Sequence, residues 1–242
     1  MNENYEALFS GVIGHDYDML NLICPAATKM SHLVGETLKN YAANTTEKLN
    51  IVELGGGTGI TTLALLNASE NIEILSVDNE AVMQNQAKKN LGKWVTAGQL
   101  TFSQNDALTA LKSLPDESVD VIASAYTLHN FLNTYRADVL TESFRVLKSG
   151  GKVINGDRYA LDDISQHTRT IQDEVAIYFR VLIAENKLDL LEHWIIHLFG
   201  DESENHIMRE SIALQQLQDE GFFDIHLKHR VGVNALMTAV KP

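Results

Sequence analysis

Cysteine and proline are scarce in this chain, which contains one cysteine and three prolines in 242 residues. A single cysteine excludes a disulfide framework and a zinc site built from thiolates, and it fits a reducing compartment. No apolar run reaches the roughly 20 residues that a membrane-spanning helix needs. The first residues, "MNENYEALFS", are acidic and polar and lack the basic and apolar regions of a signal peptide. We therefore expect a soluble, cytoplasmic protein with no membrane partner.

Positive charge is also in short supply, because 19 Lys and Arg residues face 32 Asp and Glu residues, which gives a net charge of −13. Nucleic acids and anionic membrane surfaces attract basic patches, and the densest basic cluster here is Lys88–Lys89. We therefore do not expect a nucleic-acid partner. A homodimer is left open. The hydrophobic fraction of 45% is typical of a globular protein with a full core.

The apolar pattern predicts an α/β fold. From Ile51 to "KVING", short apolar runs alternate with amphipathic helices, which favours a parallel sheet with helices on both faces. We expect a Rossmann-like, doubly wound, mostly parallel seven-stranded sheet that ends in an antiparallel hairpin of "FFDIHLKHR" and "VNALMTAV". One domain over 1–242 would comprise an N-terminal helical cap at 1–48, a cofactor-binding core at 49–157, a helical insertion at 158–206, and a closing helix and β-hairpin at 207–242.

A glycine-rich turn is the strongest local signal. In "IVELGGGTGITTLALL", a strand runs into Gly55, Gly57 and Gly59, and a helix begins at once. Glycines let the backbone turn tightly and approach a ligand, and the free N–H groups of the helix N-terminus suit a polar group. A dehydrogenase fingerprint, G-x-G-x-x-G, would need glycine at Ile60. Glu53, at the end of the strand, suits a cationic ligand better than a pyrophosphate.

Two further carboxylates follow the next two strands. Asp78 ends "IEILSVD" roughly 20 residues past the glycines, where a doubly wound fold places a carboxylate on ribose hydroxyls. Asp106 follows the third strand and could accept a hydrogen bond from an adenine amino group. Taken alone, each would be read as a cap or turn residue. Because neighbouring strand ends form one crevice, we expect Glu53, Asp78 and Asp106 to converge.

Together these segments resemble class I S-adenosylmethionine-dependent methyltransferases from Ile51 to about Gly156. "VELGGGTG" is similar to their motif I, "SVDNE" to motif II, "NDALTALKSLPDESVDVIASAYTLHNF" to the adenine motif and fourth strand, and "FRVLKSGGKVI" to the helix before the fifth strand. The resemblance implies S-adenosyl-L-methionine as the cofactor. It implies cofactor-binding roles for Glu53, Gly55, Gly56, Gly57, Gly59, Asp78, Asn79, Asp106, Ala107 and Tyr126.

A weaker similarity to the carboxy-S-adenosylmethionine synthase group extends over most of the chain. Two departures argue against that activity: a tyrosine of that group falls at Ala27, and no arginine lies around His193–His197. We therefore favour methyl transfer to a small-molecule acceptor. The alternatives are a tRNA- or protein-modifying methyltransferase, a carboxy-S-adenosylmethionine synthase-like enzyme, and a non-enzymatic, cofactor-binding partner subunit.

Candidate catalytic residues are those that follow the fourth and fifth strands, namely His129, Asp157 and Tyr159. All lie at the carboxyl edge of the predicted sheet, where ligands bind. Histidine titrates near neutral pH and is the usual general base, although positioning alone can supply much of the rate. A packing role for His129 at the start of a helix is an equal alternative.

A histidine pair lies in the helical insertion. His193 and His197 are four residues apart and share a helical face opposite the stripe of Leu188, Leu191 and Ile195. Without a clear third ligand we expect no metal here. We predict instead that this face looks into the acceptor pocket or onto its entrance.

Overall fold

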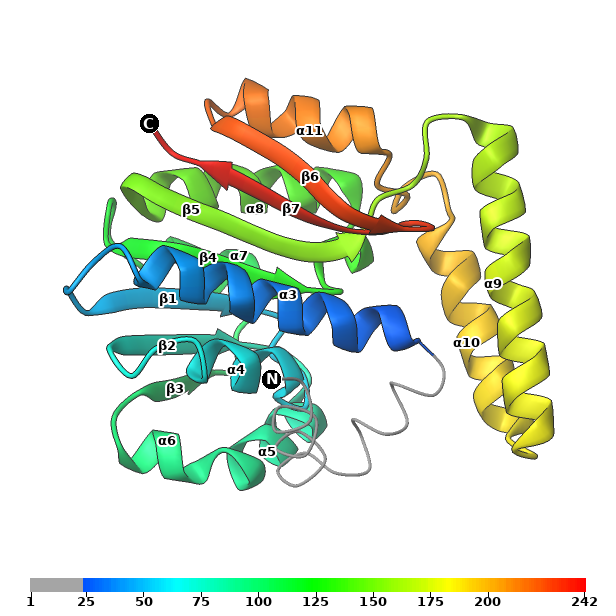
Figure 1. Ribbon diagram of the computed structural model, residues 1–242, viewed down its shortest axis with the longest axis horizontal. Helices are drawn as coiled ribbons and strands as arrows, with labels where there is room; N and C mark the ends of the chain where they lie inside the picture. The colour runs from blue at the N-terminus through cyan, green and yellow to red at the C-terminus, as the bar shows by residue number, and fades with distance from the viewer. Residues whose placement is uncertain (1–23) are drawn as a thin grey trace.

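The computed structural model describes residues 24–242, so residues 1–23 of the predicted N-terminal segment lie outside the described residues. A seven-stranded sheet has the order β3-β2-β1-β4-β5-β7-β6 (Figure 1). The strands are β1 (Leu49–Leu54), β2 (Ile72–Val77), β3 (Leu100–Ser103), β4 (Val119–Ala125), β5 (Leu147–Arg158), β6 (Phe223–Val231) and β7 (Asn234–Val240). The first five pair in parallel, whereas β7 is antiparallel to both β5 and β6. The predicted doubly wound sheet with a closing hairpin is confirmed.

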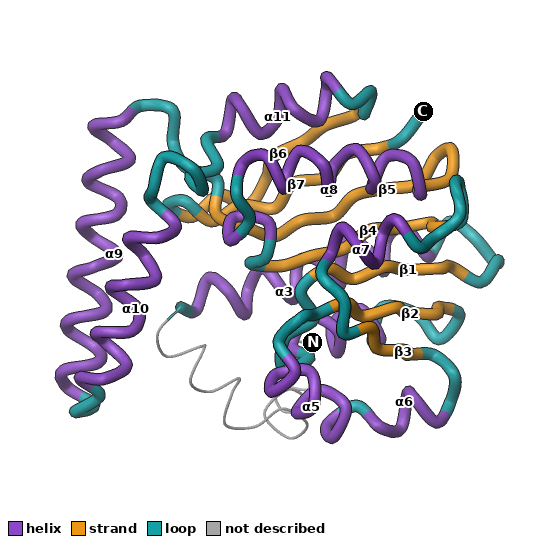
Figure 2. The backbone as a smooth tube through the Cα atoms, turned by 180° about the vertical axis from the view of Figure 1, so that it is seen from behind, coloured by secondary structure: helices purple, strands orange, loops and turns teal. Residues whose placement is uncertain are grey.

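Helices cover both faces of this sheet (Figure 2). They are α3 (Pro25–Ala42), α4 (Ile60–Leu66), α5 (Ala81–Asn90), α6 (Gly92–Thr96), α7 (Ala107–Lys112), the 3-10 turn η1 (Leu128–Asn130), α8 (Asn133–Val146), α9 (Ile164–Ala184), α10 (Leu188–Asp201) and α11 (Glu210–Asp219). One hydrophobic core joins α3 and α4 to one face, and a second joins α7, α8 and α11 to the other. The inner strands are therefore apolar along nearly their whole length, as in β4, "VDVIASA".

The described part of the predicted N-terminal cap is a layer of the fold. Helix α3 lies along the sheet, and its glycine at Gly35 meets α4 so closely that a Cβ would stand 2.7 Å from the carbonyl oxygen of Ala64. Gly156 of β5 likewise leaves room for Met30. Residues 25–42 therefore pack their apolar face against the sheet and α4.

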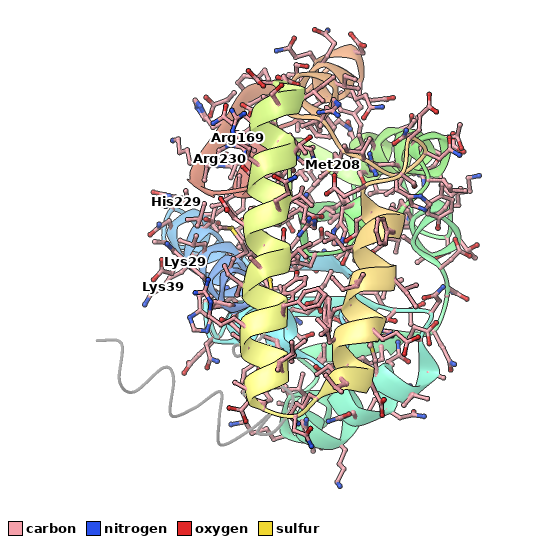
Figure 3. All side chains as sticks on the ribbon, turned by 90° about the vertical axis from the view of Figure 1, so that its right-hand side faces the viewer. Lys29, Lys39, Arg169, Met208, His229 and Arg230 are labelled. Carbon is pink, nitrogen blue, oxygen red and sulfur yellow. The ribbon has the colours of Figure 1, made fainter. Side chains whose placement is uncertain are left out.

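Helices α9 and α10 form an antiparallel pair beside the carboxyl ends of the parallel strands (Figures 1 and 3). They have a small core of their own, in which Tyr178 and Leu182 of α9 pack on Leu191 and Leu198 of α10. In the part of the chain that the structure describes, no helix is both long and apolar enough to cross a membrane. The α9–α10 pair lies opposite the carboxyl edge of the sheet (Figure 1).

Candidate active site

A cavity of about 1030 Å³ lies between the carboxyl edge of the sheet and the α9–α10 pair. Its lining includes residues that follow β1, β2, β3 and β4 and residues of both α9 and α10. Pockets for one small ligand usually measure about 300–1,000 Å³, so this cavity has room for more than one. We call the part of the cavity that is lined by the loops after β1, β2 and β3 the glycine-loop end. The part that is lined by η1 and α10 is the histidine end.

The glycine loop opens onto the cavity at Gly57. This residue has a φ of +52°, and no atom lies within 4 Å of the position that a Cβ would occupy. Its N–H donates to Oδ2 of Asp78 over 2.7 Å. At Gly55 the reason for glycine is different, because a Cβ would stand 2.0 Å from Oγ1 of Thr127. The loop is thus held tightly against its neighbours while one backbone position stays open to a ligand.

Glu53 lies beneath this loop and is not part of the cavity lining. Its Oε2 accepts a hydrogen bond from Oγ1 of Thr62 over 2.6 Å. The other oxygen, Oε1, is buried and has no hydrogen-bond partner among residues 24–242. Burial raises the pKa of this carboxyl from its ordinary value near 4.5 to about 7, although the hydroxyls of Ser76 and Thr62 lower it. Oε1 of Glu53 is therefore a buried acceptor next to the loop without a hydrogen-bond partner in the described part of the chain.

The two predicted carboxylates line the cavity, and each also holds its own loop. Besides Gly57, Asp78 accepts from the N–H of Glu80 over 2.8 Å. Asp106 is the N-cap of α7 and accepts from the backbone and the side chain of Thr109 and from the hydroxyl of Tyr135. These hydrogen bonds, chiefly that of the Thr109 hydroxyl, lower the pKa of Asp106 to about 2.

Four other predicted cofactor residues also reach the cavity. Asn79, Ala107, Gly56 and Tyr126 are all in its lining. Tyr126 has a φ of +52°, a left-handed conformation that is uncommon for residues other than glycine. Its hydroxyl donates to Oδ1 of Asn234 over 2.6 Å, which ties the end of β4 to the start of β7.

His129 and Asp157 form a buried pair at the histidine end. Nδ1 of His129 lies 2.5 Å from Oδ1 of Asp157. Asp157 also accepts from the backbone N–H groups of Leu128 and Arg158, over 2.9 and 2.8 Å. Burial alone would raise the pKa of Asp157, but His129 and these donors hold it below its ordinary value. Nδ1 of His129 therefore faces Asp157, whereas Nε2 lies on the other side of the ring, 3.8 Å from Oδ2 of Asp201.

Four predicted residues are not part of the cavity lining: Glu53 and Asp157, described above, and Tyr159 and Gly59. Tyr159 is buried in the core beneath α8 and α11, and its hydroxyl accepts from Nδ2 of Asn155 over 2.8 Å. Gly59 is the N-cap of α4, and a Cβ there would stand 2.8 Å from Leu91. Tyr159 and Gly59 therefore lie in the packed interior of the fold.

Helix α10 brings the predicted histidine pair to the cavity. His193 and His197 both line it, with their rings stacked at 6.4 Å between centroids. Burial lowers the pKa of His197 and raises that of Asp201, whose Oδ1 lies 3.6 Å from Nε2 of His197. The sequence reasoning missed Asp201, although its spacing of one helical turn from His197 was a readable signal.

Arg158 was also missed, and it anchors this wall from the end of β5. Its guanidinium is 8% exposed and bonds Glu174 of α9 over 2.7 Å and Glu202, just past α10, over 3.2 Å. Nε of Arg158 lies 3.8 Å from Oδ2 of Asp201. A buried arginine with three carboxylates therefore fixes the α9–α10 pair against the sheet.

Comparison with known proteins finds relatives of the part of the chain that forms this edge of the sheet. Residues 52–155 match the family model described as a methyltransferase domain. Over this stretch the chain is similar to methyltransferase domains, which agrees with its resemblance to class I S-adenosylmethionine-dependent methyltransferases. The match covers the glycine loop, both cavity carboxylates and the strand that precedes His129, which are the features that the sequence patterns single out.

Relatives of the methyltransferase domain include two proteins named for quinone substrates. A demethylmenaquinone methyltransferase of Leptospira interrogans is 34% identical over 127 residues, which are 52% of this chain and 48% of that protein. The mitochondrial 2-methoxy-6-polyprenyl-1,4-benzoquinol methylase of Schizosaccharomyces pombe is 28% identical over 118 residues, 45% of this chain and 37% of that protein. The chain thus spans about half the length, or less, of these curated relatives.

The fold of the methyltransferase domain also recurs in solved structures. The CurJ carbon methyltransferase superposes with a TM-score of 0.65 and 16% sequence identity, covering 97% of this chain and 61% of that chain. At this level of identity the likeness shows a shared fold. The coverage indicates that the fold continues well beyond residues 52–155.

Proposed function

We propose that this chain is an enzyme that transfers a methyl group from S-adenosyl-L-methionine to a small-molecule acceptor. The observation that carries the proposal is a single cavity that joins the glycine loop to the His129–Asp157 pair. A methyl donor held at the glycine-loop end would lie in the same space as an acceptor at the histidine end. Such proximity is a large part of what this reaction needs.

The residues at the glycine-loop end fit this cofactor. Gly57 leaves an open backbone position, Asp78 is a carboxylate that ribose hydroxyls could donate to, and Oε1 of Glu53 is a buried acceptor without a described partner. Buried polar atoms are nearly always satisfied, so the unpaired Oε1 supports a donor group bound nearby. When bound, S-adenosyl-L-methionine supplies a methyl group on a sulfonium, which leaves as a neutral thioether when the acceptor attacks.

We assign His129 as the group that takes a proton from the acceptor. Asp157 holds the ring with Nδ1–H bonded, so the Nε2 lone pair is the free one. In the reaction the acceptor gains the methyl group and loses a proton to Nε2, while Asp157 stabilises the resulting imidazolium. His129 and Asp157 thus keep their predicted catalytic roles in this proposal, whereas Tyr159 has none.

The acceptor that best fits the histidine end is an aromatic ring with an ionisable hydroxyl. Apolar and aromatic side chains of the α9–α10 pair line this part of the cavity: Tyr178, Leu190, Trp194 and Leu198. Aromatic lining favours a flat ring, and His129 needs a hydroxyl or an activated ring carbon from which to remove a proton. The names of the two quinone methyltransferase relatives agree with a quinol-type or phenolic acceptor.

Ligand-dependent melting temperature tests the cofactor. S-adenosylhomocysteine at about 100 times its Kd should stabilise the fold by about 2.7 kcal/mol, because it binds only the native state, and this corresponds to a rise of roughly 5–10 °C. NADP should change little. Asp78→Ala should weaken S-adenosylhomocysteine binding roughly 10- to 150-fold through loss of a charged acceptor worth about 1.5–3 kcal/mol.

The matched control is Asp173→Ala, which removes an exposed carboxylate of α9 outside the cavity lining. Methyl transfer is then measured with labelled S-adenosyl-L-methionine and a panel of phenols and quinols, in the wild type and in His129→Gln. Stabilisation by NADP without stabilisation by S-adenosylhomocysteine would contradict the cofactor assignment. Cofactor binding with no transfer to any small molecule would contradict the enzyme and favour a cofactor-binding partner subunit.

A further inference from the structure

The histidine end of the cavity gathers three metal-ligating side chains from two separate elements. His129 comes from η1, and His197 and Asp201 come from α10. One donor atom from each lies within 4.8 Å of the other two. All three residues line the cavity, so an ion and its remaining ligands could enter from it.

We propose that His129, His197 and Asp201 bind a divalent transition-metal ion at the acceptor side of the cavity. Two imidazole nitrogens with one carboxylate form a donor set that suits Zn²⁺, Co²⁺ or Fe²⁺, whereas Mg²⁺ and Ca²⁺ prefer oxygen ligands. Three protein ligands leave at least one coordination position directed at the cavity, as in zinc sites that keep an exchangeable ligand.

The distances between donor atoms are close to those that an ion requires. Nε2 of His129 lies 3.8 Å from Oδ2 of Asp201, and Nε2 of His197 lies 3.6 Å from Oδ1 of Asp201. Ligand bonds of about 2.0–2.2 Å in a tetrahedral site place donor atoms roughly 3.3 Å apart. These two contacts use different oxygens of Asp201, and the donor atoms of the three residues lie within 4.8 Å of one another, so side-chain adjustments of about 1 Å would bring three donors around one centre.

The surroundings of His129 match those of a metal-binding histidine. Such histidines usually donate the proton of their other ring nitrogen to a carboxylate, which orients the ring and makes the free nitrogen more basic. Asp157 accepts from Nδ1 of His129 in this way, and it is itself held by backbone N–H groups. Because Asp157 is fully buried, this orientation is fixed before any ion arrives.

The local charge also favours a cation. The carboxylates around the cluster outnumber the guanidiniums. The carboxylates are Asp157, Glu174, Asp201 and Glu202, and the guanidiniums are those of Arg136 and Arg158. Arg158 makes its shorter contacts with Glu174 and Glu202, which leaves Asp201 at the longer distance of 3.8 Å. Asp201 is the last residue of α10, and the C-terminal end of a helix dipole attracts positive charge.

Occupation of this site has a consequence for the proposed reaction. The ion would take the Nε2 lone pair of His129, which the proposed function assigns to proton removal. A bound ion should therefore inhibit methyl transfer, and a chelator should reverse the inhibition. This consequence rests on the proposed function, whereas binding of the ion does not.

The test measures ion binding by the whole chain without cofactor or acceptor. Co²⁺ is added to chelator-treated protein, with the visible absorption of the ion as the readout, and Zn²⁺ binding is measured by calorimetry. We expect one ion per chain. Asp201→Asn and His197→Gln should each weaken binding by more than the roughly 10- to 100-fold that loss of an outer carboxylate costs.

His193→Gln is the matched control, because it changes a histidine on the same face of α10 that is outside the three-residue cluster. It should leave ion affinity unchanged. Stabilisation by S-adenosylhomocysteine in every variant shows that the fold and the cofactor end are intact. No ion binding by the wild type would overturn the proposal, as would binding that His193→Gln abolishes and Asp201→Asn preserves. Neither result would affect the cofactor test, so the two proposals fail separately.

Discussion

At the scale of one residue, the buried carboxyl of Glu53 beside the glycine loop lowers the stability of the folded state when it must ionise. A carboxyl group with no exposure to water keeps its proton more readily than one in the unfolded chain, so its pKa is about 7 in the native state. Below pH 4.5 both states hold the proton. Between about pH 4.5 and 7 the unfolded state loses its proton while the folded state keeps it, so the free energy of unfolding should fall as pH rises.

The difference between the two pKa values corresponds to a loss of about 3 kcal/mol in the free energy of unfolding across that window. Urea unfolding of the wild type and of Glu53→Gln, measured from pH 4.5 to 8, isolates this contribution, since glutamine does not titrate and the other carboxyls act equally in both proteins. We expect the wild type to lose stability relative to the variant as pH rises to 7. Parallel curves for the two proteins would show that Glu53 is ionised in the native state at all of these pH values.

Asp106 gives a second prediction at this scale, because it caps α7 as well as lining the cavity. Asp106→Ala should lower the free energy of unfolding by about 1 kcal/mol through loss of the N-cap. Asp106→Asn keeps an oxygen for the N–H of Thr109 and should lose much less. Chemical unfolding of the two variants separates the cap from the charge. An equal loss in both would assign the effect to the negative charge of Asp106.

At the scale of elements, α10 has one face that serves the cavity and another that does not. Replacing both His193 and His197 by alanine should raise the acceptor KM or lower kcat, because both side chains lie at the acceptor side. The affinity for S-adenosylhomocysteine should stay within about twofold, or ~0.4 kcal/mol, since the glycine loop is untouched. Steady-state kinetics and calorimetry on the same preparations measure the two effects.

Ile196→Ala is a suitable control for this pair, because Ile196 is 64% exposed and lies outside the cavity lining. It should leave both the kinetics and the cofactor affinity near those of the wild type. Wild-type kinetics in the double histidine variant would show that this face of α10 does not contact the acceptor.

The elements also show which parts of the site could be predicted from the sequence. The glycine loop and the carboxylates Asp78 and Asp106 were predictable because each follows directly from a strand, and strand ends in a parallel sheet share one edge. The spacing of Asp201 from His197 could be read from the sequence, but its proximity to His129 could not, because His129 comes from η1 and nothing local indicates that α10 lies beside that turn. The burial of Tyr159 in the core could not be predicted, because a strand end has two sides and only the packed core shows which side a residue faces.

At the scale of the whole molecule, the sheet order was predictable in outline and the placement of helices was not. Alternating strands and helices allow few topologies, and the hairpin at the C-terminal end was visible from its two apolar runs. For α3, an amphipathic pattern fits equally a cap over a crevice or a layer on a sheet. The choice depends on tertiary contacts such as that of Gly35 with α4, which become visible only when both helices are in place.

The position of β7 also constrains the order in which the protein can assemble during synthesis. Strand β7 lies between β5 and β6, so β6 leaves the ribosome before the only described strand that can join it to the sheet. Until β7 follows, the edge of β5 has no strand beside it, while α9, α10 and α11 are already being made. An unpaired inner edge can pair with another chain, and contacts between distant segments form slowly. Stalled or slow translation just before Asn234 would therefore favour aggregation of the nascent chain over folding.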